Sequence, residues 1–228
     1  MTIQMRGVEQ KELKQIGYQT SKPKNLSSFY RNFGKRGFDI LFVLVAAPLG
    51  LTLVLIGAAL AMLGGVRPFF VQERVGKDGR VFKLLKIRTM AHNSDELLEA
   101  YLQENPEARQ QWDRKHKLED YPRIIRIGNL LRRSSLDEMP QLWNVLKGDM
   151  SIVGPRPMMV EQKAIYPGSE YFSLRPGITG PWQISDRSQS SFALRANYDQ
   201  AYFGKVSLKE DMSILCKTVG AVLQCTGR

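Results

Sequence analysis

This 228-residue sequence has few histidines and cysteines, and it lacks the common nucleotide-binding motifs. Its two cysteines, Cys216 and Cys225, form no CxxC pair, so free thiols in a reducing compartment are expected. His92 and His116 are the only histidines, and neither stands at a metal-binding spacing. There is no GxxxxGK[ST] run, no GxGxxG after a strand and no Asp-x-Asp motif. These absences argue against a P-loop, a dinucleotide fold and an ordinary nucleotide-sugar glycosyltransferase.

Acidic residues are outnumbered by basic ones, 22 against 33, which gives a formal net charge of +11 and a pI of about 9.7. This balance predicts an anionic partner, and composition does not choose among nucleic acid, anionic lipid and a polyanionic substrate. Repeats and low-complexity linkers are also absent. Because Met1 to Ser28 is polar and short of large apolar residues, we expect a flexible lead-in over residues 1–30. The apolar content of 43% is enough for the core of a single domain over residues 31–228.

Charge is missing altogether from Ile40 to Val66, a run longer than the ~20 residues that a helix needs to cross a bilayer. We therefore predict a membrane segment over residues 38–66, and a buried core helix is the alternative. Basic residues flank both ends of this run, whereas the positive-inside rule would leave only one flank of a simple span basic. Pro48 lacks the N–H that would bond to the carbonyl of Leu44, so the helix could break and turn back there. A re-entrant helix-break-helix explains both flanks, and a kinked span is the other possibility.

After the membrane segment, residues 69–75 and 80–85 have the composition of two strands around a Gly-Lys-Asp-Gly turn, which predicts a β-hairpin. Lys86 and Arg88 follow as alternate residues and would share one face if the second strand persists. From Ser207 to Gln224 an apolar stripe at helical spacing predicts a helix packed on the core. We expect an α+β, mostly helical fold with this small hairpin. The apolar positions of the C-terminal stripe are Leu208, Met212, Leu215, Val219 and Val222.

The stretch from Ser134 to Pro157, SSLDEMPQLWNVLKGDMSIVGPRP, holds two adjacent carboxylates. Pro140 has no N–H to donate and can lie only in the first turn of a helix, so Asp137 and Glu138 are expected at the helix start. Helix capping alone would explain acids at these positions. The same position would favour the charged form of Asp137, and an ionised carboxylate can attack phosphorus or hold Mg²⁺.

Basic residues surround these acids in the sequence. Arg132 and Arg133 precede the pair. Lys147 and Arg156 follow it, and prolines on both sides of Arg156 fix the turn that carries it. Because guanidinium groups and a metal ion are the usual means of stabilising charge in phosphoryl transfer, this arrangement indicates a bound polyphosphate. Ordinary surface charge is the alternative explanation for the arginines.

Five segments in order resemble the bacterial sugar transferases, also called monotopic phosphoglycosyl transferases or polyprenyl-phosphate glycosyl-1-phosphate transferases. The segments, between Lys35 and Thr218, are KRGFDI, FKLLKIRTM, RIIRIGNLLRRSSLDEMPQLWNVLKGDMSIVGPRP, RPGITGPWQIS and YDQAYFGKVSLKEDMSILCKT. The likeness is greatest to exopolysaccharide-initiating hexose-1-phosphate transferases. It implies an enzyme that moves a sugar 1-phosphate from a UDP-sugar to a polyprenyl phosphate and releases UMP. It also implies the bacterial inner membrane, with the catalytic part, residues 67–228, facing the cytoplasm.

The resemblance further implies a catalytic pair, a metal ion and a set of phosphate contacts. Asp137 and Glu138 would be the catalytic residues and the ligands of Mg²⁺, with a covalent phosphosugar on Asp137. Pro48 matches the break in the family's membrane helix, although the family's preceding serine is Ala47 here. Lys86 matches a phosphate-contacting lysine of the family. The basic residues expected at the substrate phosphates are Lys86, Arg88, Arg133, Arg156 and Arg175.

Two non-enzymatic classes remain open. One is a membrane-tethered basic module that binds nucleic acid or anionic lipid, and the other is an assembly partner of a polysaccharide export complex. Neither explains why paired acids stand beside the GPRP turn. The expected partners are therefore a UDP-sugar, a polyprenyl phosphate and membrane lipid, with no nucleic acid, and a homo-oligomer is compatible with the sequence. No segment identifies the sugar, for which galactose or glucose is the expectation from the likeness.

Overall fold

The computed structural model describes residues 29–115, 118, 123–185, 192 and 194–223. The predicted lead-in therefore lies outside the described residues except for Phe29 and Tyr30, which are already helical. A π-helical turn, Tyr30–Gly34, continues into the long helix α2, Lys35–Leu63. Further helices are α3 Ser94–Glu104, α4 Pro106–Lys115, α5 Gly128–Arg133, α6 Gln141–Lys147, α7 Glu170–Ser173, α8 Leu194–Lys205 and α9 Leu208–Leu223. Short 3₁₀ turns are Lys77–Gly79, Leu136–Glu138 and Glu161–Ala164.

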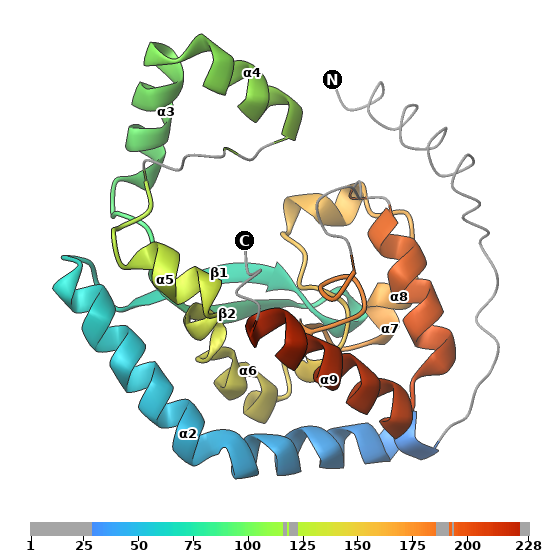
Figure 1. Ribbon diagram of the computed structural model, residues 1–228. Helices are drawn as coiled ribbons and strands as arrows, with labels where there is room; N and C mark the ends of the chain where they lie inside the picture. Colours follow the sequence, from blue (N-terminus) through green and yellow to red (C-terminus); the bar gives the residue numbers. More distant parts are fainter. Residues whose placement is uncertain (1–28, 116–117, 119–122, 186–191, 193, 224–228) are drawn as a thin grey trace.

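The described residues also form two small two-stranded sheets. Strands β1, Phe69–Val75, and β2, Val81–Ile87, pair antiparallel and confirm the predicted hairpin. A second pair, β3 Ser151–Val153 and β4 Gly177–Thr179, is parallel. The fold is thus α+β and mostly helical, as predicted. In Figure 1, α2 runs along one edge of the molecule, and α3 and α4 project away from the body.

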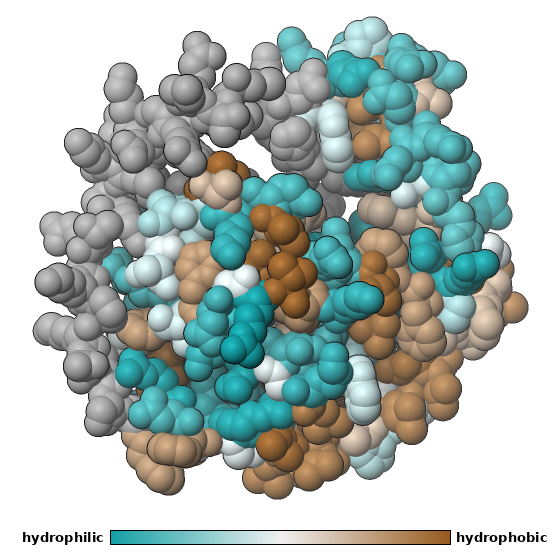
Figure 2. Space-filling view, turned by 180° about the vertical axis from the view of Figure 1, so that it is seen from behind, coloured by the Kyte–Doolittle hydropathy of each residue, from teal (hydrophilic) through white to brown (hydrophobic). Residues whose placement is uncertain are grey.

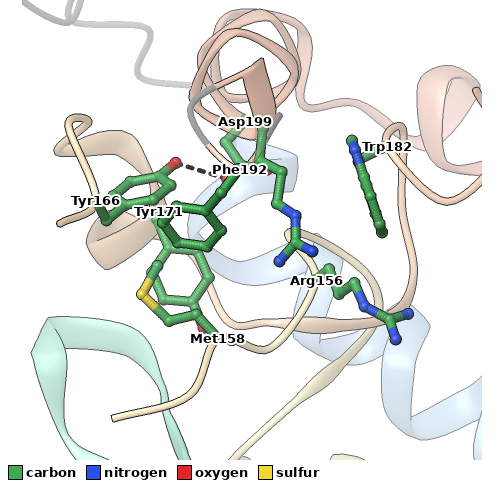
Figure 3. A pocket seen from close by; sticks show the side chains of 8 residues that line it. Arg156, Met158, Tyr166, Tyr171, Trp182, Phe192 and Asp199 are labelled. Atoms are coloured by element: carbon green, nitrogen blue, oxygen red, sulfur yellow. Dashed lines mark hydrogen bonds between the residues drawn. The ribbon is translucent and has the colours of Figure 1, made fainter. Parts of the chain in front are cut away.

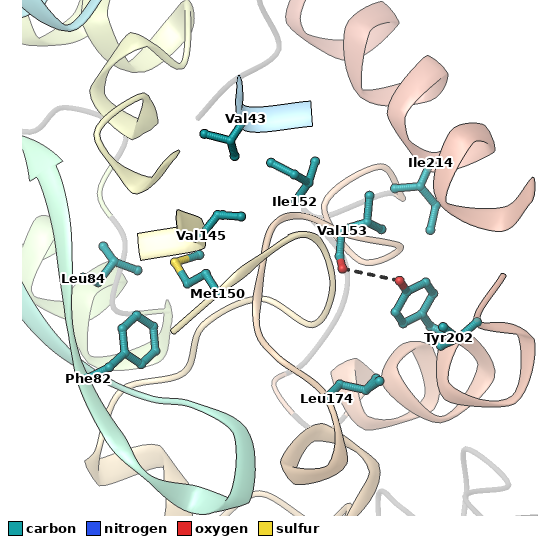
Figure 4. Close-up of a cluster of buried hydrophobic side chains, with 11 residues drawn as sticks. Val43, Phe82, Leu84, Val145, Met150, Ile152, Val153, Leu174, Tyr202 and Ile214 are labelled. Carbon is teal, nitrogen blue, oxygen red and sulfur yellow. Dashed lines mark hydrogen bonds between the residues drawn. The ribbon is translucent and has the colours of Figure 1, made fainter. Parts of the chain in front are cut away.

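The main core lies where the hairpin, β3 and helices α6, α8 and α9 meet (Figure 4). Leu84 of β2, Val145 of α6 and Ile214 of α9 are almost completely buried there. Val43 of α2 joins the same cluster, so the long helix is packed on the body of the protein and not merely attached to it. The arm formed by α3 and α4 has a small core of its own around Leu98.

Helix α2 runs through Pro48 without interruption and bends part-way along its length (Figure 1). Proline removes one backbone hydrogen bond and bends a helix at this point. One turn later, the hydroxyl of Thr52 donates to the carbonyl of Pro48 at 2.9 Å, a contact that also favours bending. The predicted break is therefore a bend in a continuous helix. The re-entrant path through a membrane stays a prediction.

The small residues of α2 face the protein and its large apolar residues face outward. Gly57 lies so close to β2 that a Cβ there would come within 2.4 Å of Ile87 Cδ1. Leu44 and Val45, by contrast, are 60% and 75% exposed. Figure 2 shows hydrophobic side chains gathered along the margin that α2 occupies. Among the described residues, only Tyr30–Leu63 is long and apolar enough to cross a membrane.

Helix α9 confirms the predicted C-terminal helix, but of its five stripe residues only Leu215 packs against the core. Leu208, Met212 and Val219 are 49%, 44% and 58% exposed. Ile214 and Asp211 face the interior instead, each at 1% exposure or less. The prediction of core packing was therefore wrong for most of the stripe, because periodicity identifies an apolar face without showing what covers it.

Candidate active site

Asp137 and Glu138 lie in the 3₁₀ turn Leu136–Glu138, here called the acidic turn, which precedes α6. Asp137 and Glu138 were expected at the start of a helix, and they lie in this 3₁₀ turn and not in the first turn of α6 itself. Pro140 is the N-cap of α6, and the α-helix itself starts at Gln141. Ser135, just before the acidic turn, has a φ of 57°, which is uncommon for a residue other than glycine and indicates a constrained backbone.

Lys86 projects from β2 to the acidic turn. Its Nζ lies 2.8 Å from Glu138 Oε1, and both side chains are about one quarter exposed, at 22% and 24%. Asn144 of α6 fixes β2 in this register, since its amide accepts from the N–H of Leu85 at 3.1 Å and donates to the carbonyl of Lys83 at 2.8 Å. Asn144 is buried, so these bonds are sheltered from water. The structure therefore places Lys86 beside the acid pair, and its contact with a substrate phosphate stays a prediction.

The carboxyl group of Asp137 is buried, and burial raises its pKa to about 6. The positive charges of Lys86 and Arg132 oppose this shift, whereas the neighbouring carboxylate of Glu138 adds to it. The expectation from helix capping was a lowered pKa, and that direction was wrong. At neutral pH the group is nevertheless mainly ionised, since its pKa still lies below 7.

Arg156 is carried by the loop that follows β3, and this loop is clamped to β4. The N–H of Gly154 donates to the carbonyl of Thr179 at 2.9 Å. A Cβ at Gly154 would lie 2.4 Å from the carbonyl oxygen of Arg175, so only glycine permits so close an approach. The GPRP and RPGITG segments of the sequence are therefore one structural unit, and its packing positions Arg156.

An open pocket of about 280 Å³ lies between the hairpin, the acidic turn and this unit. We call it the Lys86 pocket. It brings the side chains of Lys86, Arg156 and Arg74 together with Glu138, so positive charge dominates its wall. Such a wall can bind a polyphosphate. Its lining residues are Arg74, Leu84, Lys86, Glu138, Gln141, Arg156, Pro157, Gly177, Ile178 and Gln183.

Arg156 also lines a second pocket of about 230 Å³, here called the Trp182 pocket (Figure 3). The guanidinium carbons of Arg195 and Arg156 lie 4.2 and 5.6 Å from the centre of the Trp182 ring. Two further lining residues are hydrogen-bonded, since Tyr166 donates to Asp199 at 2.6 Å. Burial raises the pKa of Asp199 to about 7, against the opposing effects of that hydrogen bond and of Arg195.

Three of the predicted phosphate contacts lie elsewhere among the described residues. Arg88 follows the end of β2, and its guanidinium carbon lies 5.3 Å from the centre of the Phe70 ring. Arg175 donates from Nε to the carbonyl of Gly148, at the end of α6, at 2.9 Å. Arg133 is exposed on α5. None of the three lines either pocket.

The sequence pattern of bacterial sugar transferases matches residues 30–225. The chain belongs to the bacterial sugar transferase family. The match includes all five segments on which the resemblance rested, and it confirms that resemblance.

Several curated relatives of this sugar transferase cover most of the chain. The UDP-galactose-lipid carrier transferase of Erwinia amylovora is 44% identical over 89% of the chain and 43% of its own length. The exopolysaccharide production protein ExoY of Rhizobium meliloti is 42% identical over 85% of the chain and 87% of its own length. The undecaprenyl-phosphate galactose phosphotransferase of Salmonella typhimurium is 38% identical over 89% of the chain and 43% of its own length. The chain therefore spans less than half of the first and third proteins, but most of ExoY.

Several polar residues that this sugar transferase places around the acids were not among the predicted site residues, although Arg132 was noted beside the pair. Arg132, and not Arg133, is the arginine that acts on Asp137, and its Nε donates to Thr89 at 2.9 Å. Arg74 was considered only as part of a basic flank. Gln141 is a further lining residue of the Lys86 pocket. No local pattern marks these side chains, because the pocket joins segments that are far apart in the sequence.

The fit of a metal ion was tested on the acid pair. Within the described ranges, no group of three or more histidine, cysteine, aspartate or glutamate side chains could hold a metal ion. Asp137 and Glu138 offer two carboxylates, and Mg²⁺ is often held by one or two carboxylates together with substrate phosphates. The donor set therefore fits a Mg²⁺ ion that is shared with a diphosphate.

Proposed function

We propose that the chain is a phosphoglycosyl transferase that moves a hexose 1-phosphate from a UDP-sugar to a membrane polyprenyl phosphate and releases UMP. The observation that carries this proposal is the Lys86 pocket, in which Lys86, Arg74 and Arg156 face the acidic turn. Three cations suit a diphosphate, and the adjacent buried carboxyl supplies a reactive group. The names of the relatives support this donor and acceptor, a role in initiating exopolysaccharide synthesis, and galactose as the first sugar to test.

In the proposed reaction, the carboxylate of Asp137 attacks the sugar-bearing phosphorus. The bond from this phosphorus to the bridging oxygen breaks, UMP leaves with that oxygen, and the phosphosugar stays on Asp137 as an acyl phosphate. An oxygen of the polyprenyl phosphate then attacks the same phosphorus and restores the carboxylate. A dissolved donor and a lipid acceptor need not occupy the pocket together, because the first half-reaction finishes before the second begins.

The neighbouring side chains have separate tasks in this scheme. Lys86 binds donor phosphate oxygens and neutralises Glu138, to which it is hydrogen-bonded at 2.8 Å. The positive charge of Arg132 favours the ionised form of Asp137. Arg156, which lines the same pocket as Lys86, holds the diphosphate. Asp137 or Glu138 would hold Mg²⁺, which would supply further positive charge to the diphosphate.

The test is UMP release by purified protein in lipid nanodiscs that contain polyprenyl phosphate and Mg²⁺. A panel of UDP-sugars that includes UDP-galactose and UDP-glucose identifies the donor. We expect Mg²⁺-dependent release with one hexose donor and transfer of its label to the lipid. Absence of UMP release with every common UDP-hexose would favour a binding or assembly module without catalysis.

The raised pKa of Asp137 predicts how the first half-reaction responds to pH. Asp137 must be ionised to attack, and its carboxyl titrates near pH 6. The rate of UMP release should therefore fall as the pH drops through about 6, because the protonated fraction grows below the pKa. Single-turnover rates measured between about pH 5 and about pH 8 test this expectation. Circular dichroism over the same pH range controls for unfolding. A fall in the rate of UMP release centred near the ordinary aspartate pKa of about 4 would contradict the prediction.

We also propose that the chain lies in the inner membrane with both flanks of α2 on the cytoplasmic side. The bend near Pro48 and the exposed apolar residues of α2 support this placement. Tags at the N-terminus and after Arg228 should both be shielded from external reagents in intact cells. Pro48→Ala restores an N–H and should favour a straighter helix that crosses fully, so that one tag becomes accessible. Pro68→Ala is the matched control, because Pro68 lies after the end of α2. Labelling of either tag in the unmutated protein would exclude the re-entrant path.

A further inference from the structure

Arg74, Arg156 and Arg195 form a cluster of guanidinium groups that comes from three separate parts of the chain. Arg74 lies on β1, Arg156 on the loop after β3 and Arg195 in the first turn of α8. Arg74 and Arg156 line the Lys86 pocket, and Arg156 and Arg195 line the Trp182 pocket. Arg156 is therefore the middle member, and the cluster, here called the arginine cluster, extends from the acidic turn to Trp182.

The two outer members of the arginine cluster, Arg74 and Arg195, do not make all the hydrogen bonds that their guanidinium groups can donate. The Nε atoms of Arg74 and Arg195 are buried and have no hydrogen-bond partner among the described residues. The terminal nitrogens of Arg74 donate to neutral groups, the carbonyl of Pro157 at 3.3 Å and the side chain of Gln72 at 2.6 Å. Within the described part of the chain, no salt bridge neutralises any member of the cluster. Buried cations are normally paired, so an anion is the expected partner of this cluster.

The electrostatics of the arginine cluster agree with this geometry. Burial lowers the pKa of both Arg74 and Arg195 to about 10, and repulsion from Arg156 is the next cause in each case. Facing carboxylates act in the opposite direction, Glu161 and Glu138 on Arg74 and Asp199 on Arg195, together with nearby tyrosine hydroxyls. These carboxylates do not cancel the lowering. A bound dianion would relieve the repulsion among the three guanidinium groups.

We propose that Arg74 and Arg195, together with Arg156, bind the phosphate that leaves with the nucleotide, a phosphate monoester dianion of the UMP type. This inference rests on the proposed function. Asp137 does not line the Lys86 pocket but directly precedes Glu138, which does, so the sugar-bearing phosphorus would lie beside Lys86 and Glu138. In an in-line displacement the leaving phosphate lies on the side of that phosphorus away from the attacking group. The arginine cluster begins beside Lys86 and Glu138 and continues away from them, through Arg156 to Arg195.

The test is direct binding of UMP to the purified full-length protein in nanodiscs, measured by isothermal titration calorimetry without any donor or acceptor. Arg74→Gln and Arg195→Gln should each weaken UMP binding roughly 10- to 100-fold, as expected for the loss of one or two charge-assisted hydrogen bonds. Binding of uridine, which lacks the phosphate, should change little. Arg109→Gln is the matched control. Arg109 forms an ion pair with Glu99 on the projecting arm of α3 and α4, and it lines neither pocket.

Arg195 contacts the Trp182 ring, so Arg195→Gln could also disturb folding. Arg74→Lys and Arg195→Lys, which keep the charge, should recover part of the UMP affinity if the charge binds the phosphate. Unchanged UMP binding in both glutamine variants would overturn the inference. So would a rise in KM for polyprenyl phosphate with UMP binding intact, since the cluster would then hold the lipid phosphate. Arginine-dependent UMP binding without UMP release from any UDP-sugar would contradict the proposed function alone.

Discussion

Asp137→Asn should lower the rate of UMP release by roughly 10³-fold or more, because it removes the proposed nucleophile while keeping the volume of the side chain. Asp137→Glu should be nearly as damaging, since a displacement of ~1 Å can cost about 100-fold in rate. Both variants should fold, as their side chains remain polar and similar in shape. Asp95→Asn is the matched control, because the side chain of Asp95 is 98% exposed on α3 and lies outside both pockets.

The covalent step has a test that does not depend on turnover. Purified protein is incubated with Mg²⁺ and a UDP-sugar labelled in the sugar, and polyprenyl phosphate is left out. Label should attach to the wild-type chain with about one UMP released per chain, and peptide mapping should place it on Asp137. The Asp137→Asn chain should stay unlabelled. If UMP appears only when the lipid acceptor is present and no label attaches, transfer is direct and Asp137 is a metal ligand or a base.

The features that sequence predicted correctly depend on local chemistry. Alternating β-formers around a Gly-Lys-Asp-Gly turn fix the hairpin, and with it the position of Lys86. The uncharged run from Ile40 to Val66 is long enough for a helix that can enter a membrane, and this inference depends only on the length and composition of the run. The acid pair was found because Pro140 restricts where a helix can start. Each of these inferences uses a single continuous stretch of the sequence.

The features that sequence did not predict depend on contacts between distant segments. The pKa of Asp137 rises because the folded chain buries it, whereas the sequence showed only the nearby helix. Arg74 and Arg195 converge on Arg156 although more than a hundred residues separate the first two. Most of the apolar stripe of α9 was wrongly assigned to the core, because the charged residue Asp211 occupies the buried side of the helix.

Asp211 also connects α9 to the beginning of α2. Its Oδ2 lies 2.7 Å from Nζ of Lys35 and accepts a hydrogen bond from Tyr30 at 2.7 Å, while its Oδ1 accepts one from Tyr202 at 2.5 Å. The side chains of Asp211 and Lys35 are 0% and 10% exposed. The carboxylate therefore binds three polar side chains that come from different parts of the chain. It also fixes the first turn of α2 to α9.

Asp211→Leu should destabilise the folded protein by about 3–5 kcal/mol, because removing one partner of a buried ion pair leaves the other charge uncompensated. Lys35→Met alone should be similarly damaging, since it leaves the carboxylate buried without its cation. The double variant should recover much of the loss, because an apolar pair of similar volume avoids burying either charge. Denaturant unfolding of the nanodisc-bound protein, followed by tryptophan fluorescence, measures all three. If Asp211→Leu costs less than about 1 kcal/mol, the pair behaves as an exposed surface contact and does not hold α2 against α9. If the double variant is no more stable than the worse single one, the tyrosine hydroxyls, and not the ion pair, account for the effect of Asp211.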